Sequence, residues 1–315
     1  MTTLTASRTG TLLGAALAVL TAVPATAASA TPTAAAASID AGRLVLTPTG
    51  RGYQGSLSVT VTNNSGAAQY YSIRITEPVA GSFRGLQPTG ACVHDGRVAG
   101  RRILVCGVDG PDLKPGERRR LAVTFEVLTA PRPYPMSAAG GRVEVLPGDT
   151  GQVADADDFR TLFRGTDGSL RHPRPYVQDN EARASITTSV GEVRLTRQPD
   201  GRFAGRLPVT VWYAGDAPHD SLSVRADLPA GVEVTGTEPQ DSPSFGGFFD
   251  VPGGRLSSGE ERTFDVLFRA PAETAPGELG PVSLLLSTWY GSDEVADADP
   301  TDNAVTVAIS AADNG

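Results

Sequence analysis

Cys92 and Cys106 are the two cysteines of the chain, so a disulfide is the most specific chemistry that the sequence offers. They stand on either side of a predicted hairpin that has Gly100 near its tip. We expect an intramolecular bond with a structural role, because an exported chain meets the oxidising conditions in which disulfides persist. A free pair of thiols or an intermolecular bridge is the alternative.

The chain has few residues of the types that usually catalyse reactions. The three histidines, His94, His172 and His219, each stand in a polar, turn-like stretch, and we expect surface positions for them. The motifs Gly-x-Ser-x-Gly and His-Glu-x-x-His are absent from the sequence, which removes two common hydrolase signatures. Carboxylates are plentiful, so a glycosidase pair stays open as an alternative. We predict that the chain is not an enzyme and has no cofactor.

Two aspartate-rich stretches, at 155–158 and 293–303, could hold a hard cation, because oxygen ligands at alternate positions of a short turn can converge on calcium. Neither stretch has the spacing of an EF-hand, and Asp and Asn also stabilise turns through bonds to their own backbone. We therefore expect structural turns, with a calcium site in the second stretch as the alternative. The ligands of that alternative site would be Asp297, Asp299, Asp302 and Asn303.

Trp212 and Trp289 are the two tryptophans, and each stands at the end of a predicted strand. If the alternating apolar residues beside them face inward, both indoles point outward. Two exposed tryptophans could form a stacking platform for a glycan or a partner protein. The alternative is that one or both pack in the core or under a loop.

The N-terminal residues 1–30 have the pattern of a secretory signal peptide. An apolar stretch at 11–23 is followed by small-x-small sites at 25–27 and 28–30. The apolar stretch is too short to span a bilayer, which takes about 20 residues. We expect a soluble mature chain with no membrane span, released from the cell or loosely associated with its wall.

The charge balance argues against nucleic-acid binding. The chain has 27 Lys and Arg against 35 Asp and Glu, a net charge of -8, whereas nucleic-acid binders neutralise phosphates with basic side chains. The local basic cluster at 118–120 is expected to be the solvated start of a strand, where charge discourages pairing between sheet edges. Contact with an acidic wall polymer or a partner protein is the alternative for this cluster.

Three sequence blocks recur in the same order, which indicates one structural unit used twice. GSLSVTV at 55–61 returns as GRLPVTV at 205–211, LKPGE at 113–117 as LSSGE at 256–260, and VADAD at 153–157 as VADAD at 295–299. Apolar residues alternate with polar ones in both copies, which predicts an all-β fold of antiparallel sandwiches. The predicted parts are a signal peptide at 1–30, a disordered start at 31–37, domains at 38–165 and 183–312, and a connector at 166–182.

Residues 92–127 resemble the bacterial Ig-like repeat called DUF11, through their order of Cys, turn, strand, Cys, Leu-x-Pro-Gly-Glu and alternating strand. Residues 295–307 are similar to the Asp-x-x-Pro-x-x-Asn stretch before the last strand of DUF11 and of the related CARDB domains. The second copy departs from the pattern because it has no cysteine pair. The resemblance implies two tandem Ig-like domains, and with them a secreted or wall-associated, non-catalytic module for adhesion, display or spacing.

The expected partner of such a module is a cell-envelope protein or a glycan. The alternative function is a secreted polysaccharide-acting enzyme or a carbohydrate-binding accessory protein. The sequence does not distinguish between a protein partner and a glycan.

Overall fold

The computed structural model describes residues 35–88, 90–148, 151–240 and 244–313, and the predicted signal peptide at 1–30 lies outside them. Residues 35–315 group into one unit by their contacts. The described residues contain strands, one 3-10 turn (η1, Pro300–Asp302) and no α-helix, so the predicted all-β fold is confirmed. No helix in the described part of the chain is long and apolar enough to cross a membrane.

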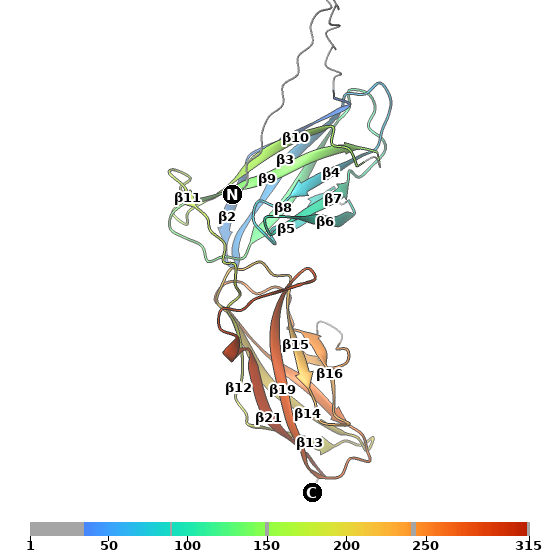
Figure 1. Ribbon diagram of the computed structural model, residues 1–315, viewed down its shortest axis with the longest axis vertical. Helices are drawn as coiled ribbons and strands as arrows, with labels where there is room; N and C mark the ends of the chain where they lie inside the picture. Colours follow the sequence, from blue (N-terminus) through green and yellow to red (C-terminus); the bar gives the residue numbers. More distant parts are fainter. Residues whose placement is uncertain (1–34, 89, 149–150, 241–243, 314–315) are drawn as a thin grey trace, which may run out of the picture. The chain divides into compact units, whose positions relative to one another are not determined.

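The first sheet is 11-stranded and is drawn in blue to yellow-green in Figure 1. Its strands are β1 (Ala37–Ala41), β2 (Leu44–Thr49), β3 (Gly52–Asn63), β4 (Tyr71–Thr76), β5 (Phe83–Gln87), β6 (Cys92–Val98), β7 (Arg101–Gly107), β8 (Arg118–Val127), β9 (Met136–Pro147), β10 (Asp155–Phe163) and β11 (Arg174–Pro175). β1 begins inside the stretch 31–37 that was predicted to be disordered.

The second sheet is 10-stranded and is drawn in yellow to red in Figure 1. Its strands are β12 (Ala184–Thr188), β13 (Glu192–Arg197), β14 (Phe203–Tyr213), β15 (Ser221–Asp227), β16 (Glu233–Glu238), β17 (Phe248–Asp250), β18 (Glu260–Ala270), β19 (Gly277–Tyr290), β20 (Asp293–Val295) and β21 (Ala304–Ala312).

The two sheets share one strand order, except that the first has an additional strand, β6, at its edge. The first is β5-β8-β3-β2-β10-β9-β4-β7-β6 and the second is β16-β18-β14-β13-β21-β19-β15-β17. In both, the first strand pairs antiparallel with the third, and the second strand pairs parallel with a late strand of the same sheet, β2 with β10 and β13 with β21. The recurring sequence blocks fall at equivalent places, within β3 and β14, before β8 and β18, and at or before β10 and β21.

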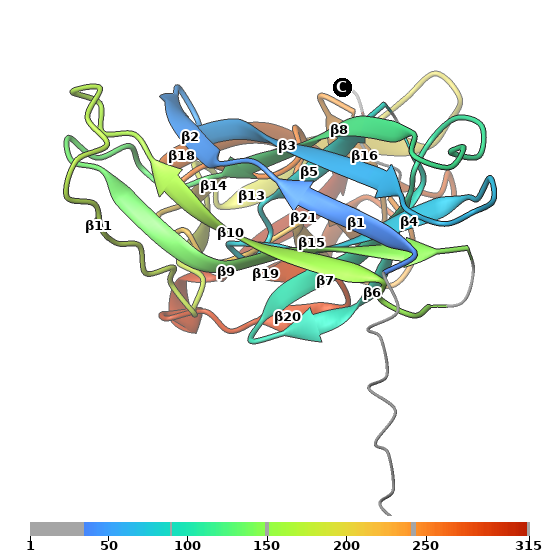
Figure 2. The same cartoon turned by 90° about the horizontal axis from the view of Figure 1, so that it is seen from above.

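Each sheet folds over on itself and encloses one hydrophobic core. In Figure 2, β1, β3 and β8 lie on one side of the first sheet and β7, β9 and β10 on the other. The alternating pattern explains the cores, since Leu57, Val59 and Val61 of β3 are all fully buried while the residues between them are not. Replacing one such leucine with alanine typically costs about 2–5 kcal/mol of stability.

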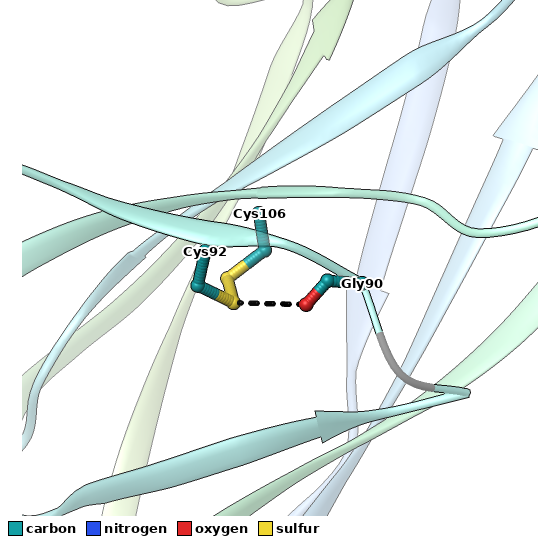
Figure 3. The surroundings of a disulfide bond; sticks show 3 residues. All are labelled: Gly90, Cys92 and Cys106. Atoms are coloured by element: carbon teal, nitrogen blue, oxygen red, sulfur yellow. Dashed lines mark hydrogen bonds between the residues drawn. A yellow bond between two sulfur atoms is a disulfide. The ribbon is translucent and has the colours of Figure 1, made fainter.

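The predicted disulfide is confirmed (Figure 3). Cys92 of β6 and Cys106 of β7 are direct cross-strand partners with their Cα atoms 4.0 Å apart. The turn between these strands is formed by Ala99 and Gly100, both with positive φ (48° and 76°), as a two-residue hairpin turn of type I′ requires. The bond therefore closes the hairpin that forms one edge of the first sheet.

The predicted connector at 166–182 is partly held by the first sheet, because β11 pairs parallel with β9. Beyond β11, the Tyr176 hydroxyl donates to Asp216 (2.8 Å), and the Gln178 amide donates to the carbonyl oxygens of Ala80 (3.0 Å) and Asp216 (3.1 Å). The connector thus bonds to residues of both sandwiches.

A buried carboxylate joins the two sandwiches. Glu77, in the loop after β4, has no exposed surface. It accepts hydrogen bonds from the backbone N–H groups of Gly81 (3.0 Å), Phe83 (2.9 Å) and Arg102 (3.1 Å), from the Arg102 guanidinium (3.2 Å) and from the hydroxyl of Tyr290 in β19 (2.8 Å). These donors offset the cost of removing the charge from water.

Further contacts surround this carboxylate. Arg102 also forms an ion pair with Asp220 of the second sandwich (3.0 Å). The guanidinium groups of Arg97 and Arg102 lie 4.5 Å and 4.9 Å from the centroid of the Tyr290 ring, a cation–π geometry. Arg97 additionally pairs with Asp293. Side chains on both sandwiches therefore fix the position of Tyr290.

Candidate functional site

The outer face of β15, β17 and β19 is the strongest candidate for a binding site. The strand register aligns its outward side chains in three rows. The rows are Leu285, Arg225 and Phe248, then Ser287, Ser223 and Asp250, then Trp289 and Ser221. Apolar side chains thus stand at both ends of the face and polar groups between them.

A tight hairpin presents two exposed phenylalanines at one end of this face. Phe245 and Phe248 exchange two backbone hydrogen bonds of 2.9 Å, and the two residues between them are Gly246 (φ 57°) and Gly247 (φ 83°). Positive φ at both central positions is the requirement of a type I′ turn, which glycine meets without strain. Phe245 is 88% exposed and Phe248 is 55% exposed.

Together these side chains line a shallow groove of about 610 Å³, here called the aromatic groove. Trp289, half-buried, lies at the end opposite to the phenylalanines. Trp289 stands four positions after Leu285 along β19, a span of about 13 Å at about 3.3 Å per residue. Residues that line the aromatic groove are Ser221, Ser223, Arg225, Phe245, Phe248, Phe249, Asp250, Leu285, Ser287, Trp289, Gly291 and Glu294.

The middle of the aromatic groove offers hydrogen-bonding groups. The Ser223 hydroxyl donates to the Asp250 carboxylate (2.5 Å), which orients both side chains. At the end of the groove, in the row of Leu285 and Phe248, Arg225 is exposed, and its guanidinium has no ion pair among the described residues. Aromatic rings flanking hydroxyl, guanidinium and carboxylate groups can take a ligand that has both apolar faces and hydroxyls.

The structure separates the two tryptophans that were predicted as a platform. Trp212 of β14 is 44% exposed, so it points outward as its strand pattern predicts. The strands β13 and β21 stand between β14 and β19 in the sheet order, and Trp212 does not line the aromatic groove. Trp289 thus lines the same groove as Phe245 and Phe248 and not the same groove as Trp212.

The aspartate-rich stretches support the first strand of each sheet. Asp155 and Asp157 accept backbone N–H groups of β1, from Ile39 (3.0 Å) and Ala41 (2.9 Å). Asp297 does the same for the N–H group of Ala184 in β12 (2.9 Å). These carboxylates satisfy backbone donors that would otherwise lack a partner.

The remaining predicted calcium ligands act in the turn before β21. Asp299 accepts from the backbone N–H (3.2 Å) and hydroxyl (2.6 Å) of Thr301, and the hydroxyl bond, followed by the N–H bond, lowers the pKa of Asp299. Burial, and then the charges of Asp299 and Asp297, raise the pKa of Asp302. Asn303 is 7% exposed, and its side-chain oxygen has no partner among the described residues. Within the described residues, no group of three or more His, Cys, Asp or Glu side chains is arranged to hold a metal.

The predicted surface position of His219 is wrong, whereas His94 and His172 are exposed. His219 is 1% exposed, its ring packs 4.5 Å from that of Tyr213, and its Nδ1 bonds to the carbonyl oxygen of Ala217 (3.1 Å). Burial lowers the pKa of His219 to about 4. The residue is part of the packing at the end of the second sandwich.

Sequence reasoning missed the two exposed phenylalanines of the aromatic groove, Phe245 and Phe248. The signal was present as Phe-Gly-Gly-Phe at 245–248, two apolar residues around a pair of glycines. Nothing in the sequence distinguishes an exposed phenylalanine from a core one at such a turn, and the exposure had to come from the structure.

No family model and no curated protein matches the chain. Among solved structures, a protein of unknown function from Porphyromonas gingivalis W83 is similar at 13% identity, covering 87% of this chain and 98% of that one, with a TM-score of 0.22. The CFA/I enterotoxigenic E. coli adhesin CfaE (mutant G168D) is similar at 7% identity, covering 82% and 79%, with a TM-score of 0.29.

A third structure, the Pseudomonas fluorescens alkylpurine DNA glycosylase AlkC bound to DNA containing an abasic site analog, is similar at 15% identity over 40% of this chain and 30% of that one, with a TM-score of 0.23. Likenesses this weak carry no functional argument. The resemblance to DUF11 and CARDB repeats stays a prediction.

Proposed function

We propose that this chain is an exported, non-catalytic binding module that holds a glycan chain in the aromatic groove. The observation that carries the proposal is the arrangement of Trp289 and the exposed pair Phe245 and Phe248 at opposite ends of one sheet face, with Ser223, Ser287 and other polar groups between them. Exposed aromatic side chains in one groove are costly to leave in water and commonly mark a binding surface.

The chemistry of the aromatic groove favours a glycan over a protein partner. The C–H faces of sugar rings pack against aromatic rings, and sugar hydroxyls pair with serine, guanidinium and carboxylate groups. A protein interface usually has an apolar centre and a polar rim, whereas here the centre is polar and the ends are aromatic. The length of about 13 Å suits an extended oligosaccharide.

We infer a non-catalytic role because the carboxylates of the aromatic groove, Asp250 and Glu294, line an open sheet face. Asp250 is held by the hydroxyl of Ser223, and Glu294 stands exposed on the hairpin beside Trp289. Glycosidases place two carboxyl groups on either side of the scissile bond in a cleft, and an open sheet face exposes a bound glycan to solvent.

Affinity electrophoresis through gels that contain soluble polysaccharides tests the proposal. We expect at least one of β-glucan, xylan, mannan, glycol chitin or solubilised bacterial cell-wall glycan to retard the native chain. Trp289→Ala and Phe248→Ala should migrate freely, and Trp212→Ala should be retarded like the native chain. Free migration of the native chain in every gel, or equal retardation of the groove variants, would refute the proposal.

A further inference from the structure

A second cavity, larger than the aromatic groove, lies where the two sandwiches and the connector meet. Its volume is about 750 Å³, and we name it the junction cleft. The first sandwich contributes Pro78–Ala80, the hairpin between β6 and β7, the start of β9 and Arg160. The connector contributes Tyr176, Gln178, Asp179 and Asn180. The second sandwich contributes Pro218, Tyr290 and residues 293–296.

The junction cleft has a basic wall and an acidic wall. Arg101 and Arg160 lie on the side of the first sandwich; Arg101 donates to backbone carbonyl oxygens and Arg160 to the Ser137 hydroxyl (2.9 Å), and neither has a carboxylate within ion-pair distance among the described residues. Asp179 and Glu294, on the connector and on β20, supply carboxylates. A ligand that carries both an anion and a cation would satisfy both walls.

Apolar side chains also line the junction cleft. Val79, Ala138, Pro218 and the ring of the buried Tyr290 line the space. The hydrogen bonds of Tyr290 to Glu77 and of Gln178 to both sandwiches fix this lining before any ligand arrives. Preformed walls of this kind reduce the ordering cost of binding.

The junction cleft and the aromatic groove meet at one hairpin. Glu294 lines both cavities, Trp289 lines the aromatic groove, and the adjacent Tyr290 lines the junction cleft. These two residues are neighbours on β19 and point to opposite sides of the strand. A single ligand that continues past this hairpin would therefore reach both cavities.

We propose that the junction cleft binds the short, zwitterionic peptide substituents of a glycan whose sugar chain lies in the aromatic groove. Arg101 and Arg160 would take the peptide carboxylate, and Asp179 and Glu294 its ammonium group. The inference rests on the proposed function, since it names the class of glycan as one substituted with peptides, which is the chemistry of bacterial cell-wall polymers.

Calorimetric titration with three probes tests this inference: a soluble cell-wall glycan fragment that carries peptide stems, the same fragment stripped of its stems by an amidase, and the free stem peptide. We expect the stem-bearing fragment to bind the native chain about tenfold more tightly than the stripped one, the effect of one charge-assisted hydrogen bond or more. Arg160→Glu should remove that difference and leave the affinity for the stripped fragment unchanged. The matched control is Arg202→Glu, an exposed arginine outside both cavities.

The outcomes separate the two proposals. Equal affinities for the stem-bearing and stripped fragments would overturn the cleft inference while leaving glycan binding in the groove intact. Binding of neither fragment would overturn both. Free peptide that binds Trp289→Ala as tightly as the stem-bearing fragment binds the native chain would make the cleft an independent peptide site, which contradicts the linked ligand proposed here.

Discussion

The hydroxyl of Tyr290 donates a hydrogen bond of 2.8 Å to the carboxylate of Glu77, a fully buried acid 213 positions earlier in the chain. The same hydroxyl accepts the backbone N–H of Gly81 (3.0 Å). One phenol of the second sandwich thus satisfies two buried polar groups of the first. Hydrogen bonds and ion pairs therefore connect the two sandwiches. Tyr290, which takes part in these contacts, also lines the junction cleft.

Tyr290→Phe should destabilise the chain by about 1–3 kcal/mol, because it removes a hydrogen bond to a buried, charged carboxylate. The Gly81 N–H group keeps its other bond, to Glu77. Equilibrium unfolding in urea measures the change. Tyr70→Phe is the matched control, since Tyr70 is 37% exposed. A loss no larger than that of the control would show that this bond contributes nothing to stability.

The folded chain should become less stable as the pH falls from 7 to 5, in part because of His219. Burial lowers its pKa in the folded chain to about 4 from the ordinary value of 6.5, so the unfolded chain binds more protons between these values. The contribution of neutral His219 to the free energy of unfolding is fully present above pH 6.5 and is lost as the pH falls toward 4. The loss is about 2 kcal/mol at pH 5. Urea midpoints of the native chain and of His219→Gln should therefore differ in their slope with pH.

His94→Gln serves as the control for this pH series, because His94 is exposed. The control should follow the native chain at each pH. If His219→Gln shows the same slope as the native chain between pH 7 and 5, the imidazole of His219 does not contribute to the pH dependence.

Removing the disulfide should lower stability by about 3 kcal/mol, the value expected for a closed loop of about 15 residues in the chain-entropy model. The bond joins residues 14 positions apart. The double variant Cys92→Ser/Cys106→Ser, unfolded in urea beside the native chain, gives the difference. Titration of the unfolded, unreduced native chain should find no free thiol, and two thiols would contradict the bond.

Calcium should leave the melting temperature unchanged, because Asp297 and Asp299 already bond to the backbone. Asp297→Ala should melt at a lower temperature than the native chain, by the same amount with millimolar calcium or with chelator. The cause is the loss of the acceptor for the Ala184 N–H. A native melting temperature that rises with calcium and falls with chelator would instead establish the metal site predicted as the alternative.

Patterns with local causes could be predicted from the sequence. Period-two alternation placed Leu207, Val209 and Val211 in the core because side chains of a strand alternate between faces. The glycine near the tip of the hairpin placed Cys92 opposite Cys106 for a similarly local reason.

Features that depend on distant contacts could not be predicted. Glu77 is one of many acids in the sequence, and its burial depends on Arg102 and Tyr290, which the fold brings to it from far along the chain. His219 follows a proline in a polar stretch, and the packing against Tyr213 that buries it is equally invisible in the pattern. The junction cleft consists of such contacts throughout, and no part of it was predicted.

The most direct test of glycan binding in the aromatic groove is the fluorescence of Trp289 itself. In Trp212→Phe this residue is the one tryptophan left in the chain, so every change in indole emission reports on the groove. Titration with the glycan that retards the native chain should shift the emission to shorter wavelength and protect it from acrylamide, with saturation. The added substitution Phe248→Ala should abolish the shift, while Arg202→Glu should leave it unchanged. Emission that stays constant through saturating glycan would contradict the account.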